Sequence, residues 1–174
     1  MEGLQATDPE RIGRFALRGR LGVGGMGRVY LGVTPQGVEA AVKVIRDELT
    51  DDPEFRQRFR REVAAAAAVS GMFTARVLDA DPDGSPPWLA TQYVSGPALR
   101  SAVQANGPLS PPAQHRLARE LAEALSAIHA AGLVHRDLKP ANVLLSPFGA
   151  KVIDFGIAQA MDSTRLTSTG MIIG

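Results

Sequence analysis

The stretch His135-Arg136-Asp137-Leu138-Lys139-Pro140-Ala141-Asn142, followed after eleven residues by Asp154-Phe155-Gly156, decides the fold. Asp137 and Asn142 lie five positions apart across a proline, which suits a loop better than one face of a helix. Apolar residues at 143–145 and 151–153 flank a turn, and they predict a hairpin that returns Asp154 to the side of Asn142. Two carboxylates and an amide oxygen would then converge. Phosphoryl transfer requires such a set, because it needs a carboxylate near the attacking hydroxyl and oxygen ligands for the metal on the nucleotide.

The composition limits the class of protein. A length of 174 residues is about one domain, and a hydrophobic content of 45% supports a packed core. The 19 Lys and Arg residues against 18 Asp and Glu residues give no argument for a nucleic-acid partner, and the absence of cysteine excludes disulfides. There is no signal-peptide pattern and no apolar run of ~20 residues. We therefore expect a cytoplasmic chain without a membrane segment, although the parent protein could carry an anchor beyond it.

A glycine-rich stretch, Gly22-Val23-Gly24-Gly25-Met26-Gly27, lies between two predicted strands. Alone, this G-x-G-x-x-G pattern also fits a dinucleotide-binding turn, but that turn opens a helix, whereas residues 29–33 here are typical of a strand. The pattern therefore predicts a hairpin flap whose backbone N–H groups can approach phosphates closely. An ordinary flexible hairpin is the alternative.

Lys43 lies in a predicted strand, residues 39–45, that is otherwise apolar on both faces. A lysine in such a strand needs an acidic partner. The next element is a predicted helix with Asp52 as its cap, Pro53 at its first position and an end near residue 69. Glu62 lies well inside this helix and is the candidate partner. Glu54, in the first turn, is better explained by the helix dipole.

The rest of the chain predicts strands at residues 75–80 and 87–94 and helices at residues 99–105 and 110–131. Four arginines on the first helix predict a solvated face or, alternatively, a site for a phosphate on a later loop. They are Arg56, Arg58, Arg60 and Arg61.

These motifs, in this order, resemble those of the eukaryotic-type protein kinases. The Ala-, Arg- and Gly-rich style resembles bacterial, actinobacterial-like members, and Asp-Leu-Lys-Pro at 137–140 resembles serine/threonine kinases. The resemblance implies an α+β, two-lobe fold with a five-stranded small lobe, one main helix and an incomplete, mostly helical large lobe. We expect a polar lead-in at 1–14, the small lobe at 15–94, and the hinge with a partial large lobe at 95–174.

The resemblance also implies a role for each site residue. Asp137 would orient the substrate hydroxyl, Lys139 would neutralise the transferring phosphate, and Lys43 with Glu62 would position the nucleotide phosphates. Asn142 and Asp154 would hold Mg²⁺, with Mn²⁺ as an alternative. The ATP site would comprise Gly22, Val23, Gly24, Gly25, Met26, Gly27, Val29, Ala41, Lys43, Thr91, Gln92, Val94 and Leu144.

Regulation is expected on the segment after Asp154, where a phosphate on Thr167 or Thr169 would pair with Arg136. The expected function is ATP-dependent phosphorylation of Ser and Thr hydroxyls on protein substrates and on the kinase itself. The chain has no A-P-E motif and would leave Leu and Ile side chains of the helix at 110–131 facing water. The alternative is therefore a truncated nucleotide-binding fragment. A small-molecule phosphotransferase of related fold is disfavoured by Arg136 and by Leu-Lys-Pro at 138–140.

Overall fold

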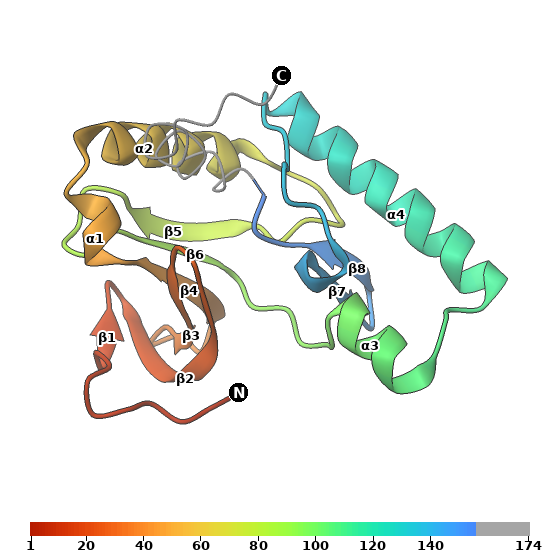
Figure 1. The fold of residues 1–174 in the computed structure, drawn as a ribbon, viewed down its shortest axis with the longest axis horizontal. Coiled ribbons are helices and arrows are strands. Elements are labelled where there is room, and N and C mark those ends of the chain that lie inside the picture. The colour runs from red at the N-terminus through yellow and green to blue at the C-terminus, as the bar shows by residue number, and fades with distance from the viewer. Residues whose placement is uncertain (156–174) are drawn as a thin grey trace, which may run out of the picture.

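The computed structural model describes residues 1–155 as two connected lobes (Figure 1). The small lobe is an antiparallel sheet with the strand order β1-β2-β3-β4-β6-β5. Its strands are β1 (Arg11–Ile12), β2 (Phe15–Gly24), β3 (Gly27–Val33), β4 (Glu39–Ile45), β5 (Val77–Asp81) and β6 (Trp88–Gln92). Between β4 and β5 the chain forms the short helix α1 (Asp47–Thr50) and the longer helix α2 (Pro53–Ala68), which contacts β5.

Helix α2 forms where the sequence predicts it. The Asp52 side chain accepts a hydrogen bond from the Glu54 N–H (2.8 Å), and Pro53 occupies the first helical position. Phe55 and Phe59 are one turn apart, fully buried and stacked with their ring centroids 6.0 Å apart. They pack in one cluster with Ile45 of β4 and Leu89 of β6, which fixes the helix against the sheet.

The N-terminal residues, expected to be a polar lead-in, are instead part of the small lobe. Residues 11–12 add a sixth strand to the predicted five, and Glu2 and Arg20 exchange backbone hydrogen bonds. The Asp8 side chain is fully buried and accepts two hydrogen bonds from Arg20 (2.6 and 2.7 Å) and one from the Tyr30 hydroxyl (2.8 Å). The charge of Asp8 in this polar segment is thus used to hold Arg20 and Tyr30 of the sheet.

The large-lobe part contains α3 (Leu99–Asn106), α4 (Pro111–Ala130), the 3-10 turn η1 (Pro140–Asn142) and the hairpin β7 (Val143–Ser146) and β8 (Gly149–Val152). Both helices lie within one residue of the predicted bounds, and α4 packs against β8. Ile128 of α4 is fully buried, and Leu117, Leu121 and Leu125 are half-buried. The expectation that apolar side chains of this helix face water is therefore wrong for Leu121 and Ile128, because β8 and the segment after α2 pack against them.

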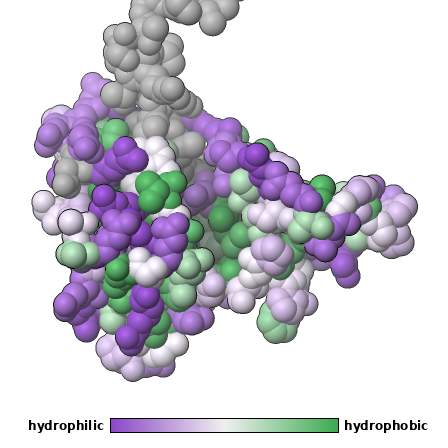
Figure 2. Space-filling view, turned by 60° about the horizontal axis from the view of Figure 1, so that its bottom comes forward, coloured by the Kyte–Doolittle hydropathy of each residue, from purple (hydrophilic) through white to green (hydrophobic). Residues whose placement is uncertain are grey.

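One apolar cluster joins the two lobes. Its members come from the end of α2, the segment after it, α4, and β8 with the residues that follow it: Ala66, Val69, Phe73, Ala124, Ile128, Val152 and Phe155. In the space-filling view the surface between the lobes is hollowed, and hydrophobic residues show inside the hollow (Figure 2). Within residues 1–155, no helix combines the length and the apolar character that a membrane crossing needs.

Candidate active site

A cavity of about 320 Å³ lies between the sheet, the segment after β6 and strand β7. Strand register brings its walls together, because Val29 of β3 pairs with Lys43 of β4, and Ala41 pairs with Thr91 of β6. Paired residues share a face of the sheet, so these side chains point into one space. The lining residues are Leu21, Gly22, Val29, Ala41, Lys43, Leu89, Thr91, Gln92, Tyr93, Val94, Gly96, Leu144, Ile153 and Asp154.

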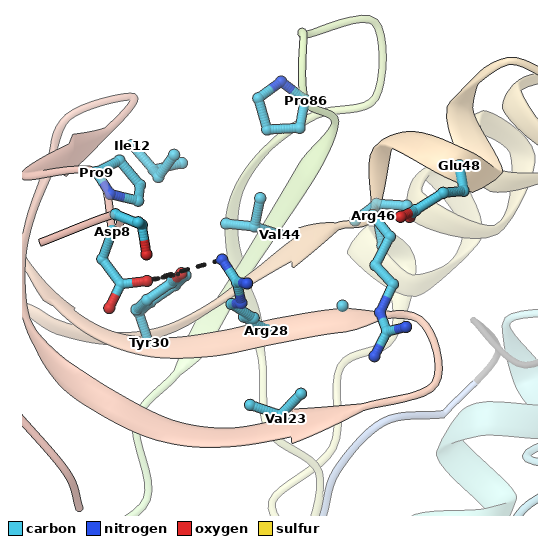
Figure 3. A pocket seen from close by; sticks show the side chains of 13 residues that line it. Asp8, Pro9, Ile12, Val23, Arg28, Tyr30, Val44, Arg46, Glu48 and Pro86 are labelled. Carbon is cyan, nitrogen blue, oxygen red and sulfur yellow. Dashed lines mark hydrogen bonds and ion pairs between the residues drawn. The ribbon is translucent and has the colours of Figure 1, made fainter. Parts of the chain in front are cut away.

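Most of the residues expected to bind ATP line this cavity, but some do not. Val23 and Gly27 line a different cavity, of about 680 Å³, which lies against the N-terminal segment (Figure 3). Gly24, Gly25 and Met26 form the end of the β2–β3 hairpin and line neither cavity. Four further lining residues are not indicated by the sequence motifs: Leu21, Leu89, Gly96 and Ile153. Strand alternation could have identified Leu89, because it lies two positions before Thr91 and so on the same face.

Lys43 and Asp154 form an ion pair inside the cavity, with 3.2 Å between Nζ and Oδ1. The lysine side chain is only 15% exposed and the aspartate side chain is 42% exposed, so the carboxylate faces the open side. Glu62, the expected partner of Lys43, is buried on α2. Its role in positioning phosphates stays a prediction.

Asp137, Lys139 and Asn142 form a second polar group. The Lys139 Nζ lies 2.7 Å from a carboxylate oxygen of Asp137, and the Asn142 side-chain amide donates to that oxygen (3.1 Å) and to the Asp137 carbonyl (2.9 Å). The hydrogen bond from Lys139, above all, holds the pKa of the Asp137 carboxyl below its ordinary value. Asp137 is therefore ionised at neutral pH and can accept a proton or a hydrogen bond from a hydroxyl.

Backbone contacts bring the two groups together, as the predicted hairpin requires. The Ile153 N–H donates to the Asn142 carbonyl (3.0 Å), so that Asp154 follows directly beside Asn142. The buried His135 donates from Nε2 to the Ile153 carbonyl (3.1 Å), and its ring meets the Phe155 ring edge-on with centroids 6.5 Å apart. His135 therefore packs behind Phe155 and holds the backbone before Asp154.

Two residues of the site have unusual backbone geometry. Asp154 has φ +57° and Arg136 has φ +61°, both in the left-handed region that costs a non-glycine residue about 1 kcal/mol or more. Such strain persists where the surrounding contacts fix the backbone, and it is common at functional sites. Arg136 is exposed. Thr167 and Thr169, its expected phosphorylated partners, lie outside the described residues.

The side-chain oxygen atoms of Asn142 and Asp154 suit a hard divalent cation. Because the Asn142 amide N–H group is directed at Asp137, the amide oxygen is the atom left for a cation. Mg²⁺ is usually bound by one or two carboxylates together with substrate phosphates and water, and Asp154 supplies such a carboxylate.

Comparison with known proteins identifies the family. The model of the protein kinase domain matches residues 15–172. The chain belongs to the protein kinase family. Among curated relatives of this kinase chain, the probable serine/threonine-protein kinase PkwA of Thermomonospora curvata is 52% identical over 174 residues. The serine/threonine-protein kinase AfsK of Streptomyces coelicolor is 53% identical over the same length.

Solved structures agree with this assignment and with the predicted two-lobe fold. The PknI kinase domain of Mycobacterium tuberculosis is 34% identical and superposes with a TM-score of 0.70 over 83% of the chain. The chain covers 60% of that kinase domain, 24% of PkwA and 22% of AfsK. It therefore contains part of a bacterial serine/threonine protein kinase domain, and protein kinases in general use ATP and Mg²⁺.

Proposed function

We propose that this chain carries the ATP site and the catalytic residues of a kinase that phosphorylates Ser and Thr hydroxyls of proteins, including its own. The observation that carries the proposal is the Lys43–Asp154 ion pair inside the interlobe cavity, linked through Ile153 and Asn142 to the ionised Asp137. A buried cation, metal-binding oxygens and a proton acceptor are the parts that phosphoryl transfer needs.

In this proposal each residue has one task. Lys43 binds the α- and β-phosphates. Asn142 with Asp154 would hold Mg²⁺, which would supply positive charge to neutralise the nucleotide phosphates. Asp137 orients the substrate hydroxyl and takes its proton. The hydroxyl oxygen forms the new bond to the γ-phosphorus, the bond to the β-phosphate oxygen breaks, and ADP leaves. Lys139, already beside Asp137, neutralises charge on the phosphoryl group as it passes.

We expect regulation through Glu62 on α2 and through Arg136 in the catalytic loop. Asp154 would hold Mg²⁺ when nucleotide is bound, and Glu62 on α2 would then replace Asp154 as the partner of Lys43. A phosphate on Thr167 or Thr169 would be bound by Arg136 and order the catalytic loop. Such an enzyme uses cellular ATP, and we place it in the cytoplasm.

The second candidate is a fragment that binds nucleotide without transferring phosphate. The 60% coverage of the PknI kinase domain favours it, because the segments that complete the large lobe are outside the match. Both candidates require the same nucleotide site, so a measurement of Mg·ATP binding tests this shared site. A measurement of phosphoryl transfer distinguishes the two candidates.

The experiment measures Mg·ATP binding to the chain by calorimetry, with Lys43→Met and Asp154→Asn as test variants. Each variant is expected to weaken Mg·ATP binding at least ~10-fold while leaving the fold intact, because one phosphate or metal contact is lost. Lys151→Met is the matched control, since Lys151 lies on β8 outside the cavity and contacts the Met72 carbonyl.

Phosphoryl transfer is then measured in the domain extended to its full length. Asp137→Asn should keep nucleotide binding and lose transfer by at least ~10²-fold, the usual contribution of a positioned base. Substantial transfer in Lys43→Met or Asp154→Asn would overturn the assigned roles.

A further inference from the structure

The turn of the glycine-rich hairpin is held by a residue outside it, Arg46, which follows the end of β4. The Arg46 backbone N–H donates to the Met26 carbonyl (3.0 Å), and its guanidinium Nη2 donates to the Gly24 carbonyl (3.1 Å). Figure 3 shows the side chain running from the end of β4 toward the β2–β3 turn. Two carbonyls of the turn are thus bound by one residue.

The neighbouring backbone leaves the hairpin little freedom at this end. Gly27 approaches β4 so closely that a Cβ placed on it would lie 1.8 Å from the Val44 carbonyl oxygen. The base of the turn is therefore fixed to β4 by direct backbone contact, and Arg46, two residues after Val44, fixes the turn itself. The glycines would otherwise allow this turn many conformations.

The contact to Gly24 also sets the direction of the next amide. In a trans peptide the carbonyl and the following N–H point in opposite directions, so a Gly24 carbonyl bound to Arg46 makes the Gly25 N–H point away from Arg46. Within residues 1–155 this N–H donates no hydrogen bond. An unused backbone N–H in a glycine-rich loop is the type of donor that binds phosphate oxygens.

Arg46 is on the wrong side of the hairpin to bind the nucleotide itself. Its side chain lines the cavity of about 680 Å³ together with Val23, Arg28 and Glu48, whereas the nucleotide cavity is lined by Gly22 and Val29 of the same hairpin. A guanidinium in that place can act on phosphate only through the turn that it holds.

We propose that Arg46 is a positioning residue for phosphate binding, which fixes the hairpin turn so that the Gly25 N–H is presented to the nucleotide phosphates. The inference rests on the proposed ATP site. It assigns to Arg46 an effect on the phosphates of the ligand and none on its base and sugar.

The test compares affinities of the chain for Mg·ATP and for adenosine, measured by calorimetry, in the unaltered chain and in Arg46→Met. The methionine keeps much of the aliphatic stem and removes the guanidinium donors. We expect Mg·ATP to bind ~3- to 10-fold more weakly, the usual net effect of one lost hydrogen bond, with adenosine affinity unchanged. Arg46→Lys, which keeps a donor, should recover part of the loss.

Arg18→Met is the matched control, because Arg18 is exposed on β2 and makes no side-chain hydrogen bond within the described residues. A second readout, the amide NMR signal of Gly25 without nucleotide, should move in Arg46→Met and stay in place in Arg18→Met. Three results would each overturn the inference. They are an equal loss of affinity for adenosine and for Mg·ATP in Arg46→Met, an equal loss of Mg·ATP affinity in Arg18→Met, and a Gly25 signal that does not move in Arg46→Met. If the unaltered chain binds neither ligand, the proposed ATP site fails, and the inference fails with it.

Discussion

Asp137 is the residue whose chemistry depends most directly on its neighbours. Lys139 and Asn142 both donate to its carboxylate, which leaves the side chain ionised and restricts it to one position. Its side chain is 47% exposed, so a substrate hydroxyl can reach it. A carboxylate that is held, charged and accessible has the properties of an acceptor for a hydroxyl proton.

The pH dependence of transfer should report the Lys139 contact. Lys139 is the main reason that the pKa of Asp137 is below its ordinary value, so Lys139→Ala should raise that pKa. More Asp137 is then protonated at low pH, and the acid limb of the transfer rate should move to higher pH. At neutral pH the rate should fall ~10- to 100-fold, because the transferring phosphoryl group also loses a neutralising charge.

The measurement is the pH profile of kcat/KM in the completed domain, with Arg119→Ala as control. Arg119 is an exposed cation on α4 that pairs with Glu123, so its removal should leave the profile in place. A lower rate with an unmoved acid limb would mean that Lys139 acts on the phosphate alone.

Among the elements, the N-terminal segment has contacts that could not be predicted from the sequence. Alternation and turn residues predicted the strands that follow it, because those signals lie within a few residues of one another. The Asp8 contacts join positions 12 and 22 residues apart, and the chain offers many arginines as partners. A local pattern cannot choose among them, so from the sequence alone the polar stretch predicts only a lead-in.

Helix α2 shows the same limit at its surface. Its position, cap and buried face were predictable from spacing and from Asp52 and Pro53. Its arginines predict a solvated face or a phosphate site. Arg60 is exposed, as a solvated face requires, and pairs with Asp83 in the β5–β6 turn, whereas the half-buried Arg56 donates to the Thr50 carbonyl (2.7 Å). A run of charges on one helix face predicts that the face is polar. It does not predict which residue each charge will contact, because that depends on the tertiary fold.

The buried Asp8 should make small-lobe stability depend on pH. The hydrogen bond from Arg20 is the main cause that lowers the pKa of Asp8, so the folded state favours its charged form. This stabilisation is fully present above the unfolded pKa of about 3.9, and it is lost as the pH falls through the lower folded pKa.

Asp8→Asn removes the charge with little change of shape and leaves Arg20 without its carboxylate. We expect its melting temperature at pH 7 to fall on the order of 5–10 °C. The difference from the unaltered chain should shrink as the pH is lowered below 4, which thermal unfolding at several pH values would measure. Asp51→Asn, at an exposed position, is the control and should leave the melting temperature within about 2 °C. A pH-independent difference would contradict the charge argument.

At the scale of the whole molecule, the width of the nucleotide cavity depends on how the linker between the lobes meets β7. The Leu145 N–H donates to the Pro97 carbonyl (2.9 Å), and Ala98 pairs with Leu144 as an isolated bridge. Leu144 lines the nucleotide cavity together with Ala41 and Thr91 of the sheet. The linker therefore sets how far Leu144 and strand β7 lie from the sheet.

Gly96→Ala should change that spacing. A Cβ at residue 96 would lie 2.1 Å from the Leu145 carbonyl oxygen, and the backbone there has φ +154°, so linker and β7 must separate. Because Leu144 moves with β7, contacts to the base are lost whatever phosphates the ligand carries. We expect adenosine and Mg·ATP to lose affinity equally, by ~10-fold, in contrast to the phosphate-specific loss in Arg46→Met.

Gly107→Ala is the matched control for this prediction, because it separates backbone strain from collision. Gly107 has φ +79° but no atom within 4 Å of its added Cβ, so alanine there meets the conformational cost without displacing a neighbour. Calorimetry should find Gly107→Ala less stable but unchanged in nucleotide affinity. If Gly96→Ala bound both ligands as tightly as the unaltered chain, β7 would not set the cavity width. The apolar cluster around Ile128 and Phe155 would then be the contact that sets the distance between the lobes.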